Sequence, residues 1–519
     1  MSSSRDLDAL IRILRPHRLA TSDASSASLV VLTVAASYVL YQVVLLALGL
    51  YRRHLHPLRR FPGRPEACVS TAWAYNESLK GFPEKTFEAL HKQYNTKALR
   101  IGPNELHISD VELYKVIYKQ IDPFPKYAVF YDSFNTPHTV FAETDPARHK
   151  IRRRLLNPMF SRAGVFKLEP VIRDKLTLLM RKVDRLREKQ DINVYNLFRI
   201  FTTEVITQYA FARSAGMIEE QENTFNAKFL ESLAVASHGI SMMYEKPWLR
   251  HLSNVLPRSL TALLSPEVER IFSLTDFANE STSHWRANGH GQKKSSYPVV
   301  FDGLGSLTAS EMSAEAVDLV VAGSDTTASS ATSAVIQILT HPEIERKLVD
   351  ALDTAIPSAD DLPPLVKLEE IDYLNACVKE CIRFTSAVPG RLPRVVPAGG
   401  EPFIVDGQVV PPGNVVSMSA YTMHTSVDIW GADARSFNPD RWLAPDAKRL
   451  EQYQVAFSKG SRMCIGQNLA PAELLILLAH IFRKYKLSLS ADFRPPPEVD
   501  VFTLEYGEPG VPIKFALRA

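Results

Sequence analysis

Apolar residues recur every three or four positions along most of this chain, which is the spacing of helices that bury one face. Between these segments, short alternating runs bounded by Gly, Pro and Asn indicate a few strands. The sequence therefore predicts a mainly α protein with small β-sheets. The expected helices cover residues 84–94, 111–119, 173–189, 195–211, 219–236, 265–285 and 308–340, and the expected strands cover 98–101, 105–108, 403–410 and 415–418.

One segment near the N-terminus departs from this pattern because it is apolar on every side. The run from Leu29 to Leu50 contains no charged residue, and it is long enough to cross a hydrocarbon layer of about 30 Å. We expect a membrane span here rather than a buried core helix or a cleaved signal peptide. The predicted organisation is an N-terminal tail (1–27), a transmembrane anchor (28–50), a basic, proline-rich hinge (51–65) and one large domain (66–519).

Charge and cysteine content narrow the classes of function. The 60 Lys and Arg residues nearly balance the 57 Asp and Glu residues, so we expect no nucleic-acid-binding surface. The four cysteines do not have the spacing of a disulfide framework, which fits a reducing compartment. Cys377 and Cys381 lie one helical turn apart, but no further Cys or His completes a metal-binding set with them.

The most informative stretch is FSKGSRMCIG, residues 457–466. Cys464 lies between two glycines, Arg462 precedes it by two positions, and an apolar helix is expected from Gln467 to Tyr485. The start of a helix favours a thiolate over a thiol, because unpaired N–H groups and the positive end of the helix dipole lie there. A thiolate, a cation and bare backbone suit a haem, with iron on sulfur and a propionate on the guanidinium. The alternative is a glycine-rich loop with a structural cysteine.

This stretch resembles the haem-binding loop of the cytochrome P-450 superfamily, FxxGxRxCxG, at every specified position. The resemblance implies haem b (iron protoporphyrin IX), with Cys464 as the axial ligand of the iron and Arg462 at a propionate. It also implies the fold of that family, a single large domain with the haem between a distal helix and the cysteine loop. The resemblance extends over roughly residues 55–519.

A second motif lies on the long segment 308–340. AGSDTT at 322–327 resembles the (A/G)Gx(D/E)T(T/S) pattern of the same family. Asp325 and Thr326 place an acid beside an alcohol, which is suitable chemistry for delivering protons to oxygen. Gly323 is unfavourable inside a helix by about 1 kcal/mol relative to Ala, so we expect the helix to open locally at this point. The alternative is a buried helix with a weak segment.

Further motifs carry structural and cofactor-binding roles by resemblance. Glu380 and Arg383 match the family's ExxR pattern, and Arg441 in FNPDRW (437–442) would join them in a buried, structural ionic triad. At the haem propionates, the resemblance places His149 and Arg153 on one helical face and Arg394 on a strand beside the haem. The alternative for His149 and Arg153 is a solvated basic face.

The resemblance implies monooxygenation, in which one oxygen atom of O2 enters a C–H or C=C bond of an apolar small molecule. No glycine-rich dinucleotide or flavin motif is present, so electrons are expected from NADPH through a separate NADPH–cytochrome reductase. The anchor and the family imply the endoplasmic reticulum membrane, with the domain in the cytosol. The sequence, the stretch GRLPRVVP (390–397) especially, resembles fungal members of the family that act in secondary metabolism. This resemblance implies a terpenoid or polyketide substrate. The alternatives are a haem-thiolate isomerase or dehydratase that acts on a peroxide without O2, and a non-enzymatic haem-binding membrane protein.

Three smaller expectations complete the sequence analysis. A basic reductase-docking face would include Lys150, Arg152, Arg154 and Lys459. The segment from Lys246 to Leu264 is a candidate roof helix at a membrane-facing lip, although its leucine spacing is equally typical of a core helix. The proline at 471 falls where the helix after Cys464 is expected, so either that helix is kinked or its first turn is irregular.

Overall fold

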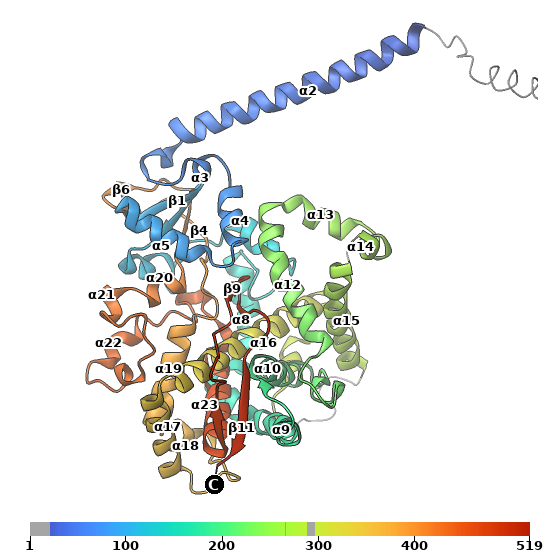
Figure 1. Cartoon of the computed structure of the whole chain (residues 1–519). Helices are drawn as coiled ribbons and strands as arrows, with labels where there is room; N and C mark the ends of the chain where they lie inside the picture. Colours follow the sequence, from blue (N-terminus) through green and yellow to red (C-terminus); the bar gives the residue numbers. More distant parts are fainter. Residues whose placement is uncertain (1–20, 265, 288–295, 519) are drawn as a thin grey trace, which may run out of the picture.

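The computed structural model describes residues 21–264, 266–287 and 296–518 (Figure 1). The first twenty residues of the predicted tail lie outside the described chain. The helices are α2 (Thr21–His54), α3 (Pro65–Val69), α4 (Ala72–Ser78), α5 (Pro83–Tyr94), α6 (Tyr114–Ile117), α7 (Ala128–Tyr131), α8 (Pro146–Phe160), α9 (Arg162–Leu186), α10 (Val194–Phe211), α11 (Met217–Glu220), α12 (Lys228–Glu245), α13 (Pro247–Val255), α14 (Arg258–Leu264), α15 (Pro266–Ala287), α16 (Ala309–Thr340), α17 (Pro342–Ala355), α18 (Leu365–Leu368), α19 (Asp372–Thr385), α20 (Ala420–His424), α21 (Val427–Trp430), α22 (Ala447–Glu451) and α23 (Leu469–Lys484).

Short 3₁₀ helices and four small sheets connect these elements. The 3₁₀ helices are η1 (Pro57–Arg60), η2 (Val111–Leu113), η3 (Asp132–Phe134), η4 (Val300–Leu304), η5 (Pro439–Trp442), η6 (Gly460–Arg462) and η7 (Ile465–Gln467). One sheet has the order β1 (Ala98–Gly102), β2 (Glu105–Ile108), β7 (Val415–Ser417) and β4 (Arg394–Val395), and a second has the order β3 (Ile192–Asn193), β11 (Pro512–Leu517) and β8 (Tyr485–Ser488). Two hairpins pair β5 (Ile404–Val405) with β6 (Gln408–Val409) and β9 (Glu498–Asp500) with β10 (Leu504–Tyr506).

In the first sheet, β2 pairs antiparallel with β1 and parallel with β7. The register places Glu105 opposite Val415, and the antiparallel pair of β7 and β4 places Arg394 opposite Val416. Arg394 is thereby fixed on a strand rather than on a loop. The predicted fold class, mainly α with small sheets, is confirmed.

Helix α16 runs through the middle of the molecule and packs against α10, α15, α19 and α23 (Figure 1). Its first turn is closed by a capping box, in which the Thr308 hydroxyl accepts from the N–H of Glu311 and the Glu311 carboxylate accepts in return. A Cβ atom on Gly323 would lie 2.6 Å from Cγ1 of Ile206 on α10. The glycine therefore permits close helix packing. The expected local opening is wrong, because α16 is helical from Ala309 to Thr340.

Two predicted helices differ from the observed ones. The helix expected over 219–236 is instead α12, from Lys228 to Glu245, preceded by the loop 221–227. In that loop the Thr224 hydroxyl accepts from the N–H of Asn226, and such local side-chain bonds compete with helix formation. The helix expected over 173–189 begins earlier, because the hydroxyl of Ser161 caps α9 by accepting from the N–H of Gly164 at 3.1 Å.

The N-terminal helix α2 extends away from the rest of the molecule at the top of Figure 1. Within the described residues, Ser28–His54 has a mean hydropathy of 2.2 and none of it is buried, so it is long and apolar enough to cross a membrane. A second apolar segment, Ile465–Lys484, contains α23, and 61% of its apolar stretch is buried inside the protein. We assign that segment to the core.

The roof segment forms two helices rather than one. Pro257 lies between α13 and α14, and a proline inside a longer helix would remove a hydrogen bond and clash with the preceding turn. Trp248 and Val255 on α13 are 60% and 81% exposed. The apolar side chains on this part of α13 therefore do not belong to the core.

Candidate functional site

The candidate site is organised around Cys464, which lies between η6 and η7 just before α23. The N–H of Cys464 donates to the carbonyl of Phe457 at 2.8 Å, which closes the loop on itself. Gly460 has a φ of +74°, and a Cβ atom there would lie 2.4 Å from the carbonyl oxygen of Lys119. A glycine is therefore required for the loop to pack against the end of α6.

The sequence predicted either a kink or an irregular first turn in the helix that follows Cys464, and the structure has the irregular first turn. Residues Ile465–Gln467 form a 3₁₀ helix, and α23 begins only at Leu469. The proline at 471 therefore lies in the first turn of α23, where a backbone N–H has no partner within the helix.

The side chain of Cys464 is solvent accessible, yet burial by the surrounding protein is the main reason that the pKa of its thiol lies above the ordinary value. The N–H of Gly466 and the charge of Arg153 lower the pKa, but they offset only part of the effect of burial. The expected thiolate is therefore not produced by the helix start alone. A metal cation at the sulfur would favour the thiolate, because coordination removes the thiol proton.

Asp325 and Thr326 point to different sides of α16. Thr326 is half-buried, and its hydroxyl donates to the carbonyl of Ala322 at 2.8 Å. The carboxylate of Asp325 is fully buried and accepts from Nε of Arg199 on α10 at 2.6 Å. Arg199 also donates to the carbonyl of Leu230 on α12. The structure therefore does not place the predicted acid beside the predicted alcohol.

The pair of Arg199 and Asp325 was not foreseen, because its members are separated by 126 residues. Burial works against the charge of Arg199, but the carboxylate of Asp325 raises the pKa of Arg199 above its usual range. Removing one partner of a buried ion pair leaves an uncompensated charge, so the two side chains are held together. Asp325 is thus tied to both α10 and, through Arg199, α12.

The predicted propionate-binding residues form one cluster of positive groups. Arg462 donates to the carbonyls of Glu143 and Thr144, at 2.8 and 3.2 Å. Arg153 donates to the carbonyl of Met463 at 2.6 Å. The acceptors are neutral backbone oxygens, so these contacts leave the charges uncompensated. The other members of the cluster are Arg394, whose Nη1 donates to the hydroxyl of Tyr131, the buried His149, and Lys126, which donates to the carbonyl of Phe141.

The electrostatics of this cluster show strong mutual repulsion. Burial lowers the pKa of His149 to about 3, and the charges of Arg462, Lys126, Arg153 and Arg394 act in the same direction. Burial and Arg394 lower the pKa of Arg462 to about 10. Burial, Arg394 and Arg462 lower the pKa of Lys126 well below its ordinary value. Asp318 and Glu143 oppose the lowering of the Lys126 pKa, and Tyr131 and Glu143 oppose that of the Arg462 pKa, but they offset these shifts only in part. A bound group with two carboxylates would relieve this repulsion.

The residues present therefore fit a haem. They supply an accessible sulfur and a set of positive groups for two propionates, and the Nε atom of Arg394 is buried without a hydrogen-bond partner in the described chain. Lys126 is the member that the sequence did not predict. It lies in the aromatic, proline-rich segment 120–144, which predicts only a loop, and a lysine there carries no motif.

The predicted structural triad is assembled as expected and is fully hydrogen bonded. Arg383 Nη2 and Arg441 Nε lie 2.7 and 3.1 Å from Oε1 of Glu380. The indole N–H of Trp442 and the backbone N–H of Asn438 also donate to Glu380, each at 2.9 Å. Glu380 is fully buried. The remaining donors of Arg383 reach backbone carbonyls in the segment 424–436, so the triad ties α19 to the chain before η5.

Helix α16 also carries two acids that no sequence motif indicated, the buried Glu315 and the half-buried Asp318. The Glu315 carboxylate accepts from the N–H of Val140 at 2.8 Å, and burial together with the charge of Asp318 raises the pKa of Glu315 to about 8. Burial raises the pKa of Asp318 to about 6, although Lys126 lowers it. Asp318, Ala322 and Thr326 are four residues apart and share one face of α16. An acid therefore lies on the same face as Thr326.

The expected basic docking face needs one correction. Arg152 is buried and forms ion pairs with Glu311 at 2.9 Å and Glu315 at 3.7 Å. It belongs to the interface between α8 and α16, so its inclusion in a surface was wrong. Lys150 and Arg154 are exposed.

Comparison with known proteins agrees with this geometry. The family model for cytochrome P450 matches residues 62–508. The chain is 31% identical to tryptophan 6-hydroxylase fscE of Fusarium equiseti, over 85% of this chain and 88% of that protein. It is also 31% identical to cytochrome P450 monooxygenase aneF of Aspergillus aculeatus, over 86% and 92%. A solved structure of the haem domain of cytochrome P450DA has a TM-score of 0.72 at 18% identity and covers 88% of this chain and 98% of that one.

Proposed function

Because the chain belongs to the cytochrome P450 family and is a haem b-dependent monooxygenase, we propose that it inserts one atom of O2 into a C–H or C=C bond of a small molecule. The electrons come from NADPH through a separate NADPH–cytochrome reductase. The observation that carries the proposal is the arrangement of Cys464 beside a cluster of positive groups, Arg153, Arg462, Arg394 and Lys126, in which burial and the charge of Arg394 lower the pKa values of Arg462 and Lys126.

The side chains of this cluster have distinct roles in the proposal. Haem, when bound, supplies a redox-active iron whose thiolate ligand favours O–O cleavage. The Sγ atom of Cys464 holds the iron. Arg394, Arg462, Arg153 and His149 hold the propionates, which brings the negative charge that their environment requires. Glu380, Arg383 and Arg441 hold the fold behind the cysteine loop without contact with the reaction.

Proton delivery is assigned to Thr326 and Asp325. The Oγ1 atom of Thr326 donates to the carbonyl of Ala322, so its lone pairs are free to accept a proton from an acid or a water molecule. Asp325 reaches this hydroxyl only when its ion pair with Arg199 opens, since its carboxylate is directed to α10. Arg199 is therefore a positioning residue for the relay.

The N-terminal helix supports a membrane location for the enzyme. The exposed, apolar segment Ser28–His54 supports an anchor, and we propose the endoplasmic reticulum membrane with the large domain in the cytosol, where the reductase is encountered. Lys150, Arg154 and Lys459 remain the proposed docking residues. Charge complementarity of this kind chiefly increases the rate of encounter.

We place the enzyme in secondary metabolism. Terpenoid and polyketide intermediates are the substrates favoured by its sequence style. Two relatives are named for hydroxylation of tryptophan and of N-acetyltryptophan, so aromatic nitrogen compounds belong to the same proposal.

The test is the carbon monoxide difference spectrum of the reduced protein in membranes, compared with that of Cys464→Ala. We expect the strongly red-shifted Soret band of a haem-thiolate in the first and its loss in the second. A folded, haem-loaded protein without that band would contradict ligation by Cys464. Product formation without NADPH would instead identify a peroxide isomerase or dehydratase.

A further inference from the structure

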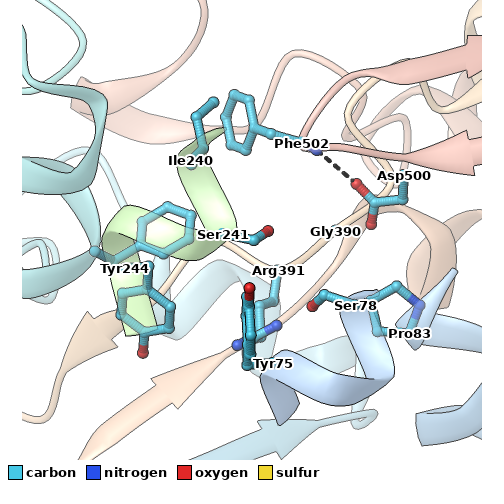
Figure 2. Close-up of a pocket in the computed structure, with 11 residues that line it drawn as sticks. Tyr75, Ser78, Pro83, Ile240, Ser241, Tyr244, Gly390, Arg391, Asp500 and Phe502 are labelled. Carbon is cyan, nitrogen blue, oxygen red and sulfur yellow. Dashed lines mark hydrogen bonds between the residues drawn. The ribbon is translucent and has the colours of Figure 1, made fainter. Parts of the chain in front are cut away.

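A cavity lies between α4, α12, the segment before β4 and the tip of the β9–β10 hairpin (Figure 2). It encloses about 570 Å³, including its open mouth. The hairpin tip reaches it through Phe502.

Aromatic rings form much of the wall of this cavity. Phe130 lies edge-on to Tyr244, with ring centroids 5.4 Å apart, and Phe502 is 6.3 Å from Phe130. Tyr75 lines the cavity from the side of α4 (Figure 2). Aromatic walls favour a flat, aromatic ligand, because rings stack in offset or edge-on arrangements.

The cavity also contains one carboxyl group, that of Asp500, at the end of β9. Oδ1 of Asp500 accepts from the N–H of Phe502 at 2.9 Å, and its backbone N–H donates to the carbonyl of Gly81 at 2.6 Å. Its other oxygen passes close to Gly390, where a Cβ atom would be only 3.1 Å away. Asp500 has no ion pair within 4 Å in the described part of the chain. The carboxyl group is therefore held in place but lacks a counter-charge.

The neighbouring charges are already paired with one another. Arg391 Nε donates to Glu105 Oε1 at 2.8 Å, and the Tyr244 hydroxyl donates to the same carboxylate at 3.3 Å. Glu84 is paired with His107 at 3.0 Å. These pairs leave Asp500 as the one acid of the cavity wall without its own cation. A ligand with a positive charge would complete the balance.

We propose that this cavity binds an aromatic molecule that carries a protonated amino group, with the ammonium at the carboxylate of Asp500 and the ring among Phe130, Tyr244 and Phe502. The proposal rests on the proposed function, because the ligand is the substrate of that enzyme or is on its path to the haem. It narrows the substrate from apolar molecules in general to aromatic amines. Ammonium groups are also attracted to aromatic faces, so the walls contribute to the same selectivity.

The proposal predicts a definite dependence on pH. Burial and the charge of Glu84 raise the pKa of Asp500 to about 7, while the N–H of Phe502 and the charge of Arg391 lower it. An ammonium ligand requires the ionised carboxylate, so its affinity rises with pH through about 7 and then levels off. The groups that face or adjoin Asp500 are Glu84, Arg391, Glu105, His107, Tyr244 and Glu498.

The experiment is equilibrium dialysis of the haem-loaded, full-length protein with three probes that share one ring. Tryptamine carries an ammonium, tryptophol a hydroxyl and indole-3-acetate a carboxylate. At pH 8 we expect tryptamine to bind about tenfold more tightly than tryptophol, and indole-3-acetate to bind least. Asp500→Asn removes this preference, whereas Asp492→Asn, at an exposed position near the same strand, retains it. Equal binding of tryptamine and tryptophol, or a preference that survives in Asp500→Asn, would overturn the proposal.

Two further measurements keep the outcome decisive. If Asp500→Asn does not fold, the ratio of tryptamine to tryptophol affinity is followed from pH 6 to pH 8 in the unaltered protein, and a ratio that does not rise refutes the role of Asp500. The carbon monoxide spectrum is recorded on the same samples. A normal haem-thiolate band with no preference for tryptamine rejects the substrate class and leaves the monooxygenase assignment intact, while loss of the band in folded, haem-loaded protein rejects the assignment of Cys464.

Discussion

Replacement of Glu380 by Gln tests the buried triad directly. The Glu380 carboxylate accepts five hydrogen bonds, two from Arg383 and one each from Arg441, Asn438 and Trp442. It also supplies the negative charge opposite two buried guanidinium groups. A glutamine of the same shape removes that charge, and its NH2 group would face the N–H groups that now donate to the carboxylate. Breaking a buried ion pair in this way costs about 3–5 kcal/mol, and we expect a loss of that size in the free energy of unfolding.

The assay is urea unfolding of the purified holoprotein in detergent, followed by far-ultraviolet circular dichroism. The matched control is Asp433→Asn, which removes a second carboxylate from Arg441, 2.9 Å away, at a site where the Asp433 side chain is 45% exposed. An exposed partner contributes about 1 kcal/mol or less. If Glu380→Gln loses no more stability than this control, the triad does not stabilise the fold as argued.

Three other predictions follow from contacts described above. Gly323→Ala should destabilise the protein by about 1–3 kcal/mol through its clash with Ile206. In thermal unfolding, the same substitution should cost less when it is made in the Ile206→Ala variant than in the unaltered protein; an equal cost in both would contradict the packing argument. The Lys126→Met variant should release haem several-fold faster than the unaltered protein in a haem-transfer assay, whereas Lys150→Met, at an exposed position, should not. Equal rates of haem release from the two variants would show that Lys126 is not part of the propionate site. Burial lowers the pKa of His424 to about 3, so below pH 6.5 the unfolded chain binds a proton that the folded chain excludes. The free energy of unfolding therefore falls as the pH drops. His424→Gln should make this fall less steep between pH 6.5 and 4.5, and an unchanged dependence on pH would assign it to other groups.

The parts of the site that the sequence predicted are those carried by short, contiguous patterns. The loop around Cys464 and the pair of Glu380 and Arg383 each lie within a few residues, so chain spacing alone brings their members together. Arg441 was added correctly because its own motif is local. The partners of Asp325 and Asp318 could not be found in this way, since Arg199 and Lys126 are distant in the chain and belong to no motif.

The helices could be predicted where buried apolar residues recur over many turns. Their ends were harder to predict where hydrogen bonds of polar side chains determine where a helix begins. The pattern over 308–340 differs from α16 by a single residue at its start. The pattern over 219–236 failed because hydrogen bonds of Thr224 and similar side chains stabilise a loop inside an otherwise helical spacing. The predicted opening of the helix at Gly323 was wrong for a related reason. Helix propensity describes an isolated helix, whereas the glycine at this position allows α10 to approach α16 closely.

The triad behind the cysteine loop also has a consequence for the order in which the molecule assembles. Glu380 and Arg383 are three residues apart, so their bond forms as soon as α19 does. Arg441 joins from 61 residues further along the chain, and closing so long a loop is slow compared with forming one helix. The cysteine loop begins only a short distance after Arg441, so the last member of the triad and the loop that it supports become available for folding at nearly the same stage of synthesis.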